Sequence, residues 1–352
     1  MSKKIVVTGG TGFVGYHVVK KLLQKKVGEV FCLARKESNK KYLQTLPVTI
    51  VDGDLLDKAS LEKALEGCEI LFHVAADYRL WAKDGDEIVR SNVLGTRNIL
   101  EAAKKYSVKK VVYTSSVAAV GRPHPSKNLE GDIPSLVDKG RWDWEKKWAG
   151  SEAMDPTLEQ LIGPYKQSKF SAELVARKFA QEGMDLVIVN PSTPVGSHDI
   201  KPTPTGKLAL DFLKGKMPAY LETGLNFVDV EDVAMGHLLA LEKGKRGERY
   251  ILGNKNLMLK EFFNILSQLT GRPAPKYKIP YWFAYGVGWT TTLFSNFTGK
   301  TPLVPLDGVK MAKEIMFYRA DKAIQELGFN PGSVEKALEK SVRFFQNEGY
   351  LK

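Results

Sequence analysis

Residues 6–23 read VVTGGTGFVGYHVVKKLL, in which an apolar run meets a glycine-rich turn and then an amphipathic helical pattern. Gly9, Gly12 and Gly15 have the spacing G-x-x-G-x-x-G. Glycine is needed where a backbone turns tightly, where it approaches a pyrophosphate, and where a helix packs closely on a strand. The helix N-terminus that follows offers N–H groups and a partial positive charge to phosphates. The stretch therefore predicts a dinucleotide-binding strand–turn–helix, and a merely tight turn is the weaker alternative.

The first half of the chain alternates short apolar runs with amphipathic helical patterns. The runs are rich in β-branched residues and mostly apolar on both faces, as strands buried on two sides are. They cover residues 4–8, 29–35, 48–54, 69–76, 109–116 and 185–191. The helical patterns between them cover residues 13–26, 57–67, about 86–106 and 165–183. This alternation indicates an α/β fold with a Rossmann-like, doubly wound parallel sheet.

Beyond residue 191 short strands and helices mix with turns rich in proline and glycine. We expect residues 1–191 to form the dinucleotide-binding domain, with an insertion at about 122–163. Residues 192–352 are expected to form mainly a smaller, irregular α/β substrate-binding region on the C-terminal side, with some segments returning to the first domain.

The end of the second apolar run selects the nucleotide. An acidic residue there would bind the ribose 2′-hydroxyl of NAD. The run ends in CLARKES, residues 32–38, so that Arg35 and Lys36 stand where a 2′-phosphate would lie and the first carboxylate is Glu37. Guanidinium groups suit phosphate, which favours NADP(H) over NAD(H). The alternative is that Arg35 is an ordinary surface residue with no role in cofactor binding.

Two later strand ends are also expected to line the cofactor. One is the segment DGDLLD after the third run, near the adenine, and the other is HVAA at the end of the fourth run. Together with two residues of the glycine turn, the residues expected along the cofactor here are Thr11, Phe13, Asp54, Leu55, Val74, Ala75 and Ala76. His73 lies inside an apolar strand, so a packed, hydrogen-bonded histidine is a better interpretation than a general base.

The segment PYKQSK, residues 164–169, opens another helical pattern. Its proline suits a first helical turn, and residues four apart lie on one face, so Tyr165 and Lys169 point the same way. Ser115 and Ser116 close the fifth apolar run, and ligands of a doubly wound sheet bind beyond the carboxyl ends of its strands. An ammonium about 4 Å from a phenol interacts with it by about 4 kcal/mol at an effective dielectric of ~20, which would lower a phenol pKa of ~10. This setting favours a catalytic pair over two ordinary surface residues.

Several motifs occur in order along nearly the whole chain: TGGTGFVG, HVAA, RSNVLGTRNIL, YTSSVAAVG, YKQSK, NPSTPVG and FVDVEDVAMGHLLALEKG. Through them the sequence resembles the extended short-chain dehydrogenases/reductases, and within these the dihydroflavonol 4-reductase-like branch. It is most similar to the bacterial hopanoid-associated sugar epimerases, through HVAADYRLWA, NPSTPVG, KPTPTG, MPAY and GERYILG.

The resemblance implies a role for each matching residue. Tyr165 would be the catalytic acid/base, and Lys169 would bind the nicotinamide ribose and lower the tyrosine pKa. Ser116 would hydrogen-bond the substrate oxygen, with Ser115 beside it, and Asn92 would complete the tetrad and its proton relay. The residues implied near the nicotinamide carboxamide are Asn190, Pro191 and Ser192.

Two segments leave alternatives open. The connection at about 122–163 is longer than the family's usual path from serine to tyrosine and carries Trp142, Trp144 and Trp148. It is either a lid over the substrate or, as we favour, a surface excursion packed on the protein's own flank. The apolar segment 279–294, IPYWFAYGVGWTTTLF, could line a greasy pocket, touch a membrane or belong to the core, and the core is our expectation.

Composition narrows the classes of partner. The chain has 352 residues, 43% hydrophobic and 26% charged, as in ordinary soluble globular proteins. It shows no signal peptide and no run of about 18 apolar residues that could span a bilayer, so a cytoplasmic protein is expected. Cys32 and Cys68 lack metal or redox spacing, so buried free thiols and no metal site are expected.

The net charge of +12 is spread over helix faces and turns, without a nucleic-acid-binding motif. A solvated basic surface is the simplest interpretation, and weak attraction to anionic lipid or to a phosphorylated cofactor is the functional alternative. Formation of a homodimer stays open.

The leading functional interpretation is an NADP(H)-dependent reductase that interconverts a ketone and a secondary alcohol, with a small and hydrophobic substrate. The alternative is a nucleotide-sugar epimerase or dehydratase with the same tetrad and a permanently held cofactor. A non-catalytic nucleotide sensor or scaffold is disfavoured, because such a protein would not need Tyr165 and Lys169.

Overall fold

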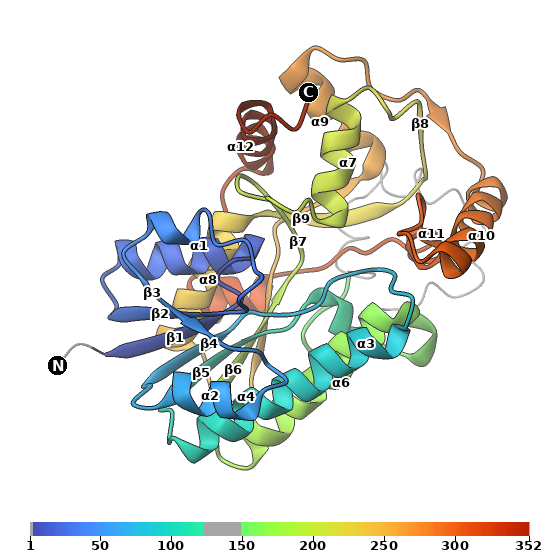
Figure 1. Cartoon of the computed structure of the whole chain (residues 1–352). Coiled ribbons are helices and arrows are strands. Elements are labelled where there is room, and N and C mark those ends of the chain that lie inside the picture. The colour runs from blue at the N-terminus through green and yellow to red at the C-terminus, as the bar shows by residue number, and fades with distance from the viewer. Residues whose placement is uncertain (1–2, 123–148, 352) are drawn as a thin grey trace.

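The computed structural model describes residues 3–122 and 149–351 (Figure 1). Its central strands are β1 (Lys4–Thr8), β2 (Glu29–Ala34), β3 (Thr49–Asp52), β4 (Ile70–His73), β5 (Lys110–Thr114), β6 (Leu186–Pro191) and β10 (Arg249–Leu252). They form one seven-stranded sheet in the order β10-β6-β5-β4-β1-β2-β3, and every neighbouring pair is parallel. The strand order reverses between β1 and β4, which is the switch point of a doubly wound sheet. The fold class predicted from the alternation is confirmed.

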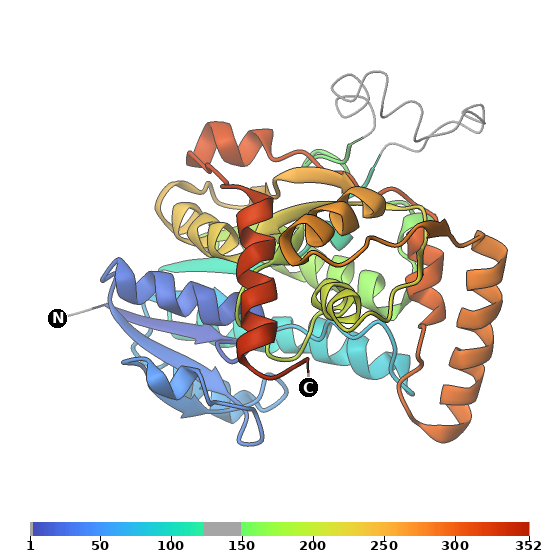
Figure 2. The same cartoon turned by 90° about the horizontal axis from the view of Figure 1, so that it is seen from above.

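Helices cover both faces of this sheet (Figures 1 and 2). One face carries α1 (Phe13–Gln24) and α8 (Val230–Lys243), and the other carries α2 (Lys58–Leu65), α4 (Gly95–Lys105) and α6 (Gly163–Gln181). Because strand side chains alternate between faces, Val6 enters one core while Ile5 and Val7 enter the other, and all three are fully buried. Strands buried on both sides explain the uninterrupted apolar runs of the sequence.

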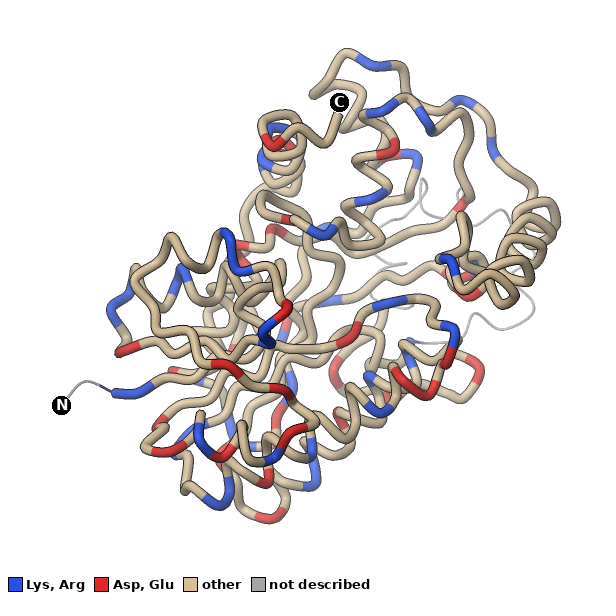
Figure 3. Tube along the Cα trace, in the orientation of Figure 1, with Lys and Arg blue, Asp and Glu red and all other residues tan. Residues whose placement is uncertain are grey.

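The remaining elements of the first half are short. α3 (Gly85–Val89) continues through a π-helical segment (Arg90–Leu94) into α4. Single helical turns occur at Leu43–Thr45, Val117–Ala119 and Leu158–Gln160, and a further π-helical segment at Ala323–Leu327. Around the sheet, lysines and arginines alternate with acidic residues along helices and turns (Figure 3).

A second, smaller layer stands over the carboxyl ends of the strands (Figure 1). Its strands β7 (Thr193–Val195), β9 (Gly224–Asp229) and β11 (Lys255–Met258) form a sheet in the order β11-β9-β7, and β8 (Ala219–Tyr220) pairs with β12 (Tyr277–Lys278). Helices α7 (Pro204–Leu213), α9 (Leu259–Thr270) and α12 (Val334–Asn347) enclose a separate apolar core with this sheet. Two elements beyond residue 191 belong to the central part of the fold: β10 is a strand of the seven-stranded sheet, and α8 packs on one face of that sheet.

The long connection before α6 is described only at its ends, and Trp142, Trp144 and Trp148 lie outside the described residues. The N–H of Gly121 donates to the carbonyl of Met154 at 2.8 Å, and the N–H of Gly150 donates to that of Phe317 at 2.9 Å. The two ends therefore lie against each other, and the second end also contacts the segment that contains Phe317.

The apolar segment that we expected in the core forms α10 (Tyr281–Thr298), next to α11 (Leu306–Ala312), and the core interpretation is wrong. The buried residues of α10 are small: Ala284, Gly288 and Ser295. Small side chains let the helix approach α11 closely, and a Cβ at Gly288 would already lie 3.1 Å from Val309. The large aromatic residues consequently face outward.

Two further expectations concern single features. Cys32 and Cys68 are buried free thiols, as predicted, and burial raises their pKa to about 12 and about 11. Within the described ranges, none of the helices has the length and apolar character needed to cross a membrane.

Candidate active site

The turn after β1 is shaped by its glycines. Gly9 has a φ of +74°, and a Cβ there would lie 2.7 Å from the backbone nitrogen of Ala75. A Cβ at Gly15 would overlap the carbonyl oxygen of Gly9, to which Gly12 donates its N–H at 2.9 Å. The helix cap, Gly12, has no side chain that could bond the amides of the first turn. The backbone of the turn and the start of α1 are thus bare toward an approaching ligand.

A buried network fixes the end of β4 beside this turn. The hydroxyl of Thr8 lies 2.8 Å from Nδ1 of His73 and accepts the N–H groups of Val74 and Ala75 at 3.1 Å each. Nε2 of His73 lies 3.2 Å from the hydroxyl of Thr96. Burial lowers the pKa of His73 to about 3, so its ring is neutral at physiological pH. The prediction of a packed, hydrogen-bonded histidine is confirmed.

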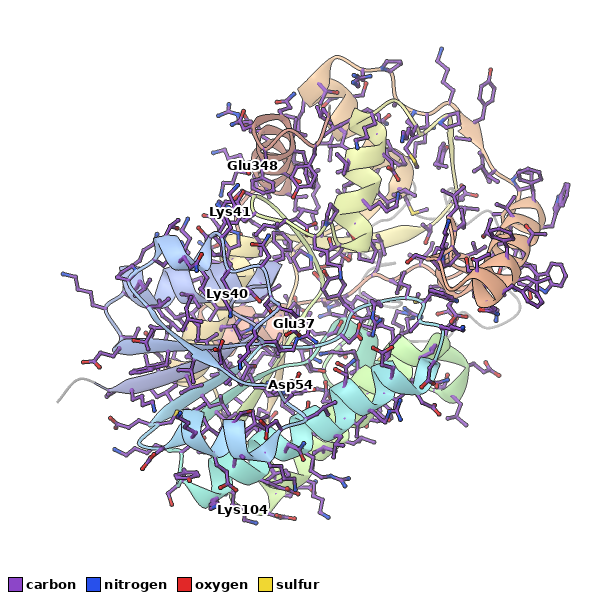
Figure 4. The ribbon with its side chains drawn as sticks, in the orientation of Figure 1. Glu37, Lys40, Lys41, Asp54, Lys104 and Glu348 are labelled. Atoms are coloured by element: carbon purple, nitrogen blue, oxygen red, sulfur yellow. The ribbon has the colours of Figure 1, made fainter. Side chains whose placement is uncertain are left out.

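Charged side chains gather beyond the ends of β2 and β3. The exposed guanidinium of Arg35 lies with Nε 3.2 Å from Oε1 of Glu37, and Nζ of Lys40 lies 3.1 Å from Oδ1 of Asp52. Figure 4 labels Glu37, Lys40 and Asp54 near the carboxyl ends of these strands. The positive charges of Arg35 and Lys40 at these strand ends are therefore already balanced in part by the carboxylates of Glu37 and Asp52.

The two residues expected near the adenine lie in the loop between β3 and α2. Oδ1 of Asp54 accepts the N–H of Leu56 at 2.8 Å. The carbonyl of Leu55 accepts the side-chain amide of Asn98 at 2.9 Å. Hydrogen bonds within the loop and with Asn98 of α4 therefore hold Asp54 and Leu55 in place.

The first turn of α6 meets the end of β5. Tyr165 makes a side-chain hydrogen bond with Ser116. Nζ of Lys169 donates to the carbonyl of Thr114 at 3.1 Å and lies 5.8 Å from the ring centroid of Tyr113. The structure thus brings Tyr165 and Lys169 of α6 to the end of β5, where Ser116 lies far from them in the sequence.

Burial dominates the electrostatics of this pair. It raises the pKa of Tyr165, and the hydrogen bond with Ser116 lowers that pKa in part. It also lowers the pKa of Lys169 to about 8, against the opposing charge of Glu173. The expected lowering of the tyrosine pKa by Lys169 is not met in this structure: desolvation raises that pKa, and the group that opposes the shift is Ser116, not Lys169. At neutral pH the phenol is protonated and Lys169 is mostly an ammonium.

Asn92 lies in the π-helical segment between α3 and α4, a kind of irregularity common at functional sites. Its Oδ1 accepts the N–H of Asp77 at 2.7 Å, and its Nδ2 donates to the carbonyl of Asp77 at 2.9 Å and to the hydroxyl of Ser168 at 2.8 Å. Its amide therefore fastens the loop after β4 to α6. Among the described residues it makes no hydrogen bond to Lys169.

A buried ionic cluster behind Lys169 was missed in the sequence. Glu173 is fully buried, and its Oε1 accepts Nη1 of Arg249 at 3.1 Å. Its Oε2 accepts Nδ2 of Asn190 at 2.7 Å, which orients the amide of Asn190. One signal was available, because Glu173 lies four residues after Lys169 and hence on the same helix face. Nothing in the sequence pointed to Arg249.

A second missed group flanks Tyr165. Lys166 is buried, and burial and the charge of Arg122 lower its pKa to about 8. Arg122 pairs with Glu314 and donates to the hydroxyl of Tyr318 at 3.3 Å. These contacts tie the chain at Arg122 to the segment that follows α11.

Comparison with known proteins identifies this architecture. Residues 5–142 and 144–253 match the NAD dependent epimerase/dehydratase family. The chain belongs to this family. Its members are NAD(P)-dependent oxidoreductases and epimerases, and the resemblance to the extended short-chain dehydrogenases/reductases is confirmed.

Individual family members cover the whole chain. A Synechocystis protein named "Putative dihydroflavonol 4-reductase" is 48% identical over 356 residues, which cover 100% of this chain and 97% of that protein. The "Sterol demethylase protein B" of Methylococcus capsulatus is 32% identical over 350 residues, which cover 98% and 99%. The crystal structure of gox2253 matches with a TM-score of 0.80 and 40% identity over 99% of this chain and 100% of that one.

The residues at the strand ends fit the nicotinamide dinucleotide of this family. Ser115 Oγ, Asn190 Oδ1 and Ser192 Oγ are buried without a hydrogen-bond partner within residues 3–122 and 149–351. Buried polar atoms without partners are rare, and these three lie at the ends of β5 and β6, where a doubly wound sheet binds its ligand. A polar ligand group such as a carboxamide would satisfy them, while the bare glycine turn suits the phosphates.

Proposed function

We propose that the protein is an NADP(H)-dependent oxidoreductase that interconverts a ketone and a secondary alcohol, with Tyr165 as the acid/base. One observation carries this proposal. Tyr165 is hydrogen-bonded to Ser116 at the carboxyl end of β5, and Lys169 reaches the same strand end through the carbonyl of Thr114. This is a proton donor and an oxygen-binding hydroxyl at the position where the fold binds its ligand.

The bound nicotinamide supplies or accepts the hydride. In the reducing direction the substrate oxygen gains negative charge, and the hydroxyl of Ser116 would donate a hydrogen bond to it. Tyr165 then gives its proton to that oxygen. Because burial raises the pKa of Tyr165, the phenol is in the protonated form that this step requires at neutral pH.

The neighbouring residues hold this arrangement. The ammonium of Lys169 has one proton on the carbonyl of Thr114 and can donate others to the cofactor ribose. Asn92 acts as a positioning residue, because its amide joins the loop at Asp77 to Ser168 of α6. Glu173 holds the amide of Asn190, whose Oδ1 would then accept from the carboxamide.

Arg35 and Lys36 support the choice of NADP(H). The Arg35 guanidinium is exposed at the end of β2 and pairs with a carboxylate that is itself exposed, so a doubly charged 2′-phosphate could compete for it. Lys36 adds a second cation at the same strand end.

A hydrophobic substrate is supported by two observations. The loop at residues 78–81, which reads YRLW, follows the residue that Asn92 holds and is rich in large apolar side chains. In addition, the relative named sterol demethylase protein B has a name that points to a lipid-derived substrate. We therefore propose ketones or secondary alcohols on apolar ring systems as the substrate class.

The test measures net cofactor consumption. Purified protein is incubated with NADPH and a panel of aromatic ketones, sterol-like ketones and nucleotide sugars, and we expect loss of NADPH absorbance in proportion to alcohol formed from an apolar ketone. In parallel, untreated protein is denatured and assayed for released cofactor. Stoichiometric co-purified cofactor, inversion of a nucleotide sugar and no NADPH loss on any ketone would replace this proposal with an epimerase.

A further inference from the structure

Helix α10 turns its large apolar side chains to solvent. Trp282 is 75% exposed, Phe283 53%, Trp289 52%, Phe294 67% and Phe297 81%. The helix lies at the outer edge of the molecule in both views (Figures 1 and 2). Contiguous apolar patches of this kind are unusual on a monomer and mark a surface that meets something other than water.

The distribution of charge around α10 indicates what it meets. Residues 279–299 contain no charged side chain, whereas Lys276 and Lys278 come before them and Lys300 follows. The helix is accordingly free of charged residues along its length in Figure 3. Tryptophan and other aromatic rings framed by lysines are typical of the interface between lipid headgroups and acyl chains. Lys278 is paired with Glu222, so the attraction to anionic headgroups is carried by Lys276 and Lys300.

We propose that α10 docks the protein onto the surface of an anionic lipid bilayer, with its aromatic face in the headgroup–acyl boundary. The helix has 18 residues and is thus about 27 Å long. It lies along the membrane surface rather than across it, because its opposite face is fixed to the protein. Thr291 donates to the carbonyl of Val304 at 2.9 Å, and Thr292 accepts the N–H of Leu306 at 3.0 Å.

A second copy of the chain is the competing occupant, and the area argues against it. One face of a helix about 27 Å long and about 10 Å wide offers on the order of 300 Å². A stable interface takes about 800 Å² from each partner. Two α10 helices packed on each other would fall short of that area, whereas a bilayer covers any convex apolar ridge.

The docking surface is joined to the candidate active site. The indole N–H of Trp81, in the apolar loop after β4, donates to Oδ1 of Asn296 on α10 at 3.3 Å. Gly163, which begins α6, lies against Asp307 of α11. If the proposed function on apolar substrates holds, substrate would reach the site directly from the bilayer.

Vesicle flotation tests the docking without any assay of turnover. We expect the full chain to float with vesicles of phosphatidylcholine and phosphatidylglycerol, and less with phosphatidylcholine alone or at high salt. The variant Trp282→Gln/Trp289→Gln should lower the partition coefficient roughly tenfold for each tryptophan removed from the interface. The matched control is Leu56→Gln/Ile324→Gln, which replaces two other exposed apolar residues and should leave binding unchanged.

Circular dichroism and light scattering complete the experiment, by showing that each variant is folded and which assembly it forms. Failure of the wild-type chain to bind the mixed vesicles overturns the proposal. So does a dimer that the tryptophan variant disrupts while vesicles bind neither form, since α10 is then a contact between chains. Tyr165→Phe should float like the wild type, which separates this inference from the proposed reaction.

Discussion

At neutral pH Tyr165 is a half-buried, protonated phenol beside Ser116, and this pairing determines the outcome of removing its hydroxyl. Tyr165→Phe should reduce turnover by roughly 10²–10⁴, the usual contribution of a positioned acid or base. The dissociation constant for NADPH should change little, because the ring stays in place. Steady-state kinetics and fluorescence titration measure the two quantities.

Tyr277→Phe is the control for this substitution, because Tyr277 is exposed and distant from Ser116 in the chain. It should leave both turnover and cofactor affinity unchanged. Near-normal turnover of Tyr165→Phe on a ketone would contradict the assignment of Tyr165 as the proton donor.

Substitutions of Arg35 and Glu37 should change the affinity for NADPH in opposite directions. Arg35→Ala should weaken NADPH binding roughly 10- to 100-fold, the worth of a charge-assisted hydrogen bond to phosphate, and should leave NADH binding almost unchanged. Glu37→Gln removes the carboxylate that pairs with Arg35 and should strengthen NADPH binding by a few-fold. Titration of both cofactors into wild type and variants is the measurement, and equal wild-type affinities for NADPH and NADH would refute the preference.

Sequence patterns predicted residues whose relation is local. Tyr165 and Lys169 lie four apart on a helix, and Ser116 follows an apolar strand, so periodicity and strand ends predicted their places, whereas the resemblance supplied their roles. The ionic cluster of Glu173 and Arg249 joins a helix to a distant strand, which no local pattern reveals. The direction of the Tyr165 pKa shift was also misjudged, because burial depends on the whole fold.

At the scale of the element, the start of α1 depends on the absence of a side chain at Gly15. The methyl group of Gly15→Ala would overlap the carbonyl oxygen of Gly9, so the turn must open. We expect at least tenfold weaker NADPH binding, and a free energy of unfolding lower by about 1–3 kcal/mol, as in other overpacked sites. Titration and urea unfolding measure these effects.

Gly286 in α10 provides the matched helical control. A Cβ there meets no atom within 4 Å. Gly286→Ala should therefore raise the free energy of unfolding by about 0.5–1 kcal/mol, because alanine favours the helix, and should not affect NADPH. If Gly15→Ala behaved like Gly286→Ala, the close packing of the glycine turn would be disproved.

The helices and strands of the first half were predictable to within a few residues, because each has a clear period and a turn at its end. The packing of α10 was not predicted, since its large apolar residues alone do not tell which face meets the protein. The spacing of its small residues, Ala284, Gly288 and Ser295, was the available signal. Small residues on one helix face indicate close packing there and leave the large side chains to the other face.

At the scale of the whole molecule, three buried histidines couple folding to pH. Burial lowers the pKa of His17 to about 4, of His73 to about 3 and of His237 to about 4, from an ordinary value near 6.5. As the pH falls below about 6.5, the unfolded chain binds protons at these rings that the folded chain does not. The free energy of unfolding therefore falls with pH in this window. Asp199 opposes the trend, because burial raises its pKa to about 6 and the folded state takes up its proton first.

Three histidines lower the free energy of unfolding as the pH falls, and one carboxyl, that of Asp199, raises it. We therefore expect the free energy of unfolding to be lower by roughly 2–4 kcal/mol at a pH of about 5.5 than at about 7. Urea unfolding at the two pH values measures this difference.

In His237 both ring nitrogens make hydrogen bonds: Nδ1 lies 2.7 Å from the carbonyl of Val233, and Nε2 lies 2.8 Å from the hydroxyl of Thr114. The carbonyl can only accept, so Nε2 is the acceptor in the neutral ring, and protonation there would reverse the second bond, with Nε2 donating to the hydroxyl of Thr114. His237→Gln should be less stable at both pH values, yet its pH dependence should shrink by about one histidine's share, roughly 1.3 kcal/mol over this interval. A variant that kept the full wild-type difference would show that the protons are taken up elsewhere.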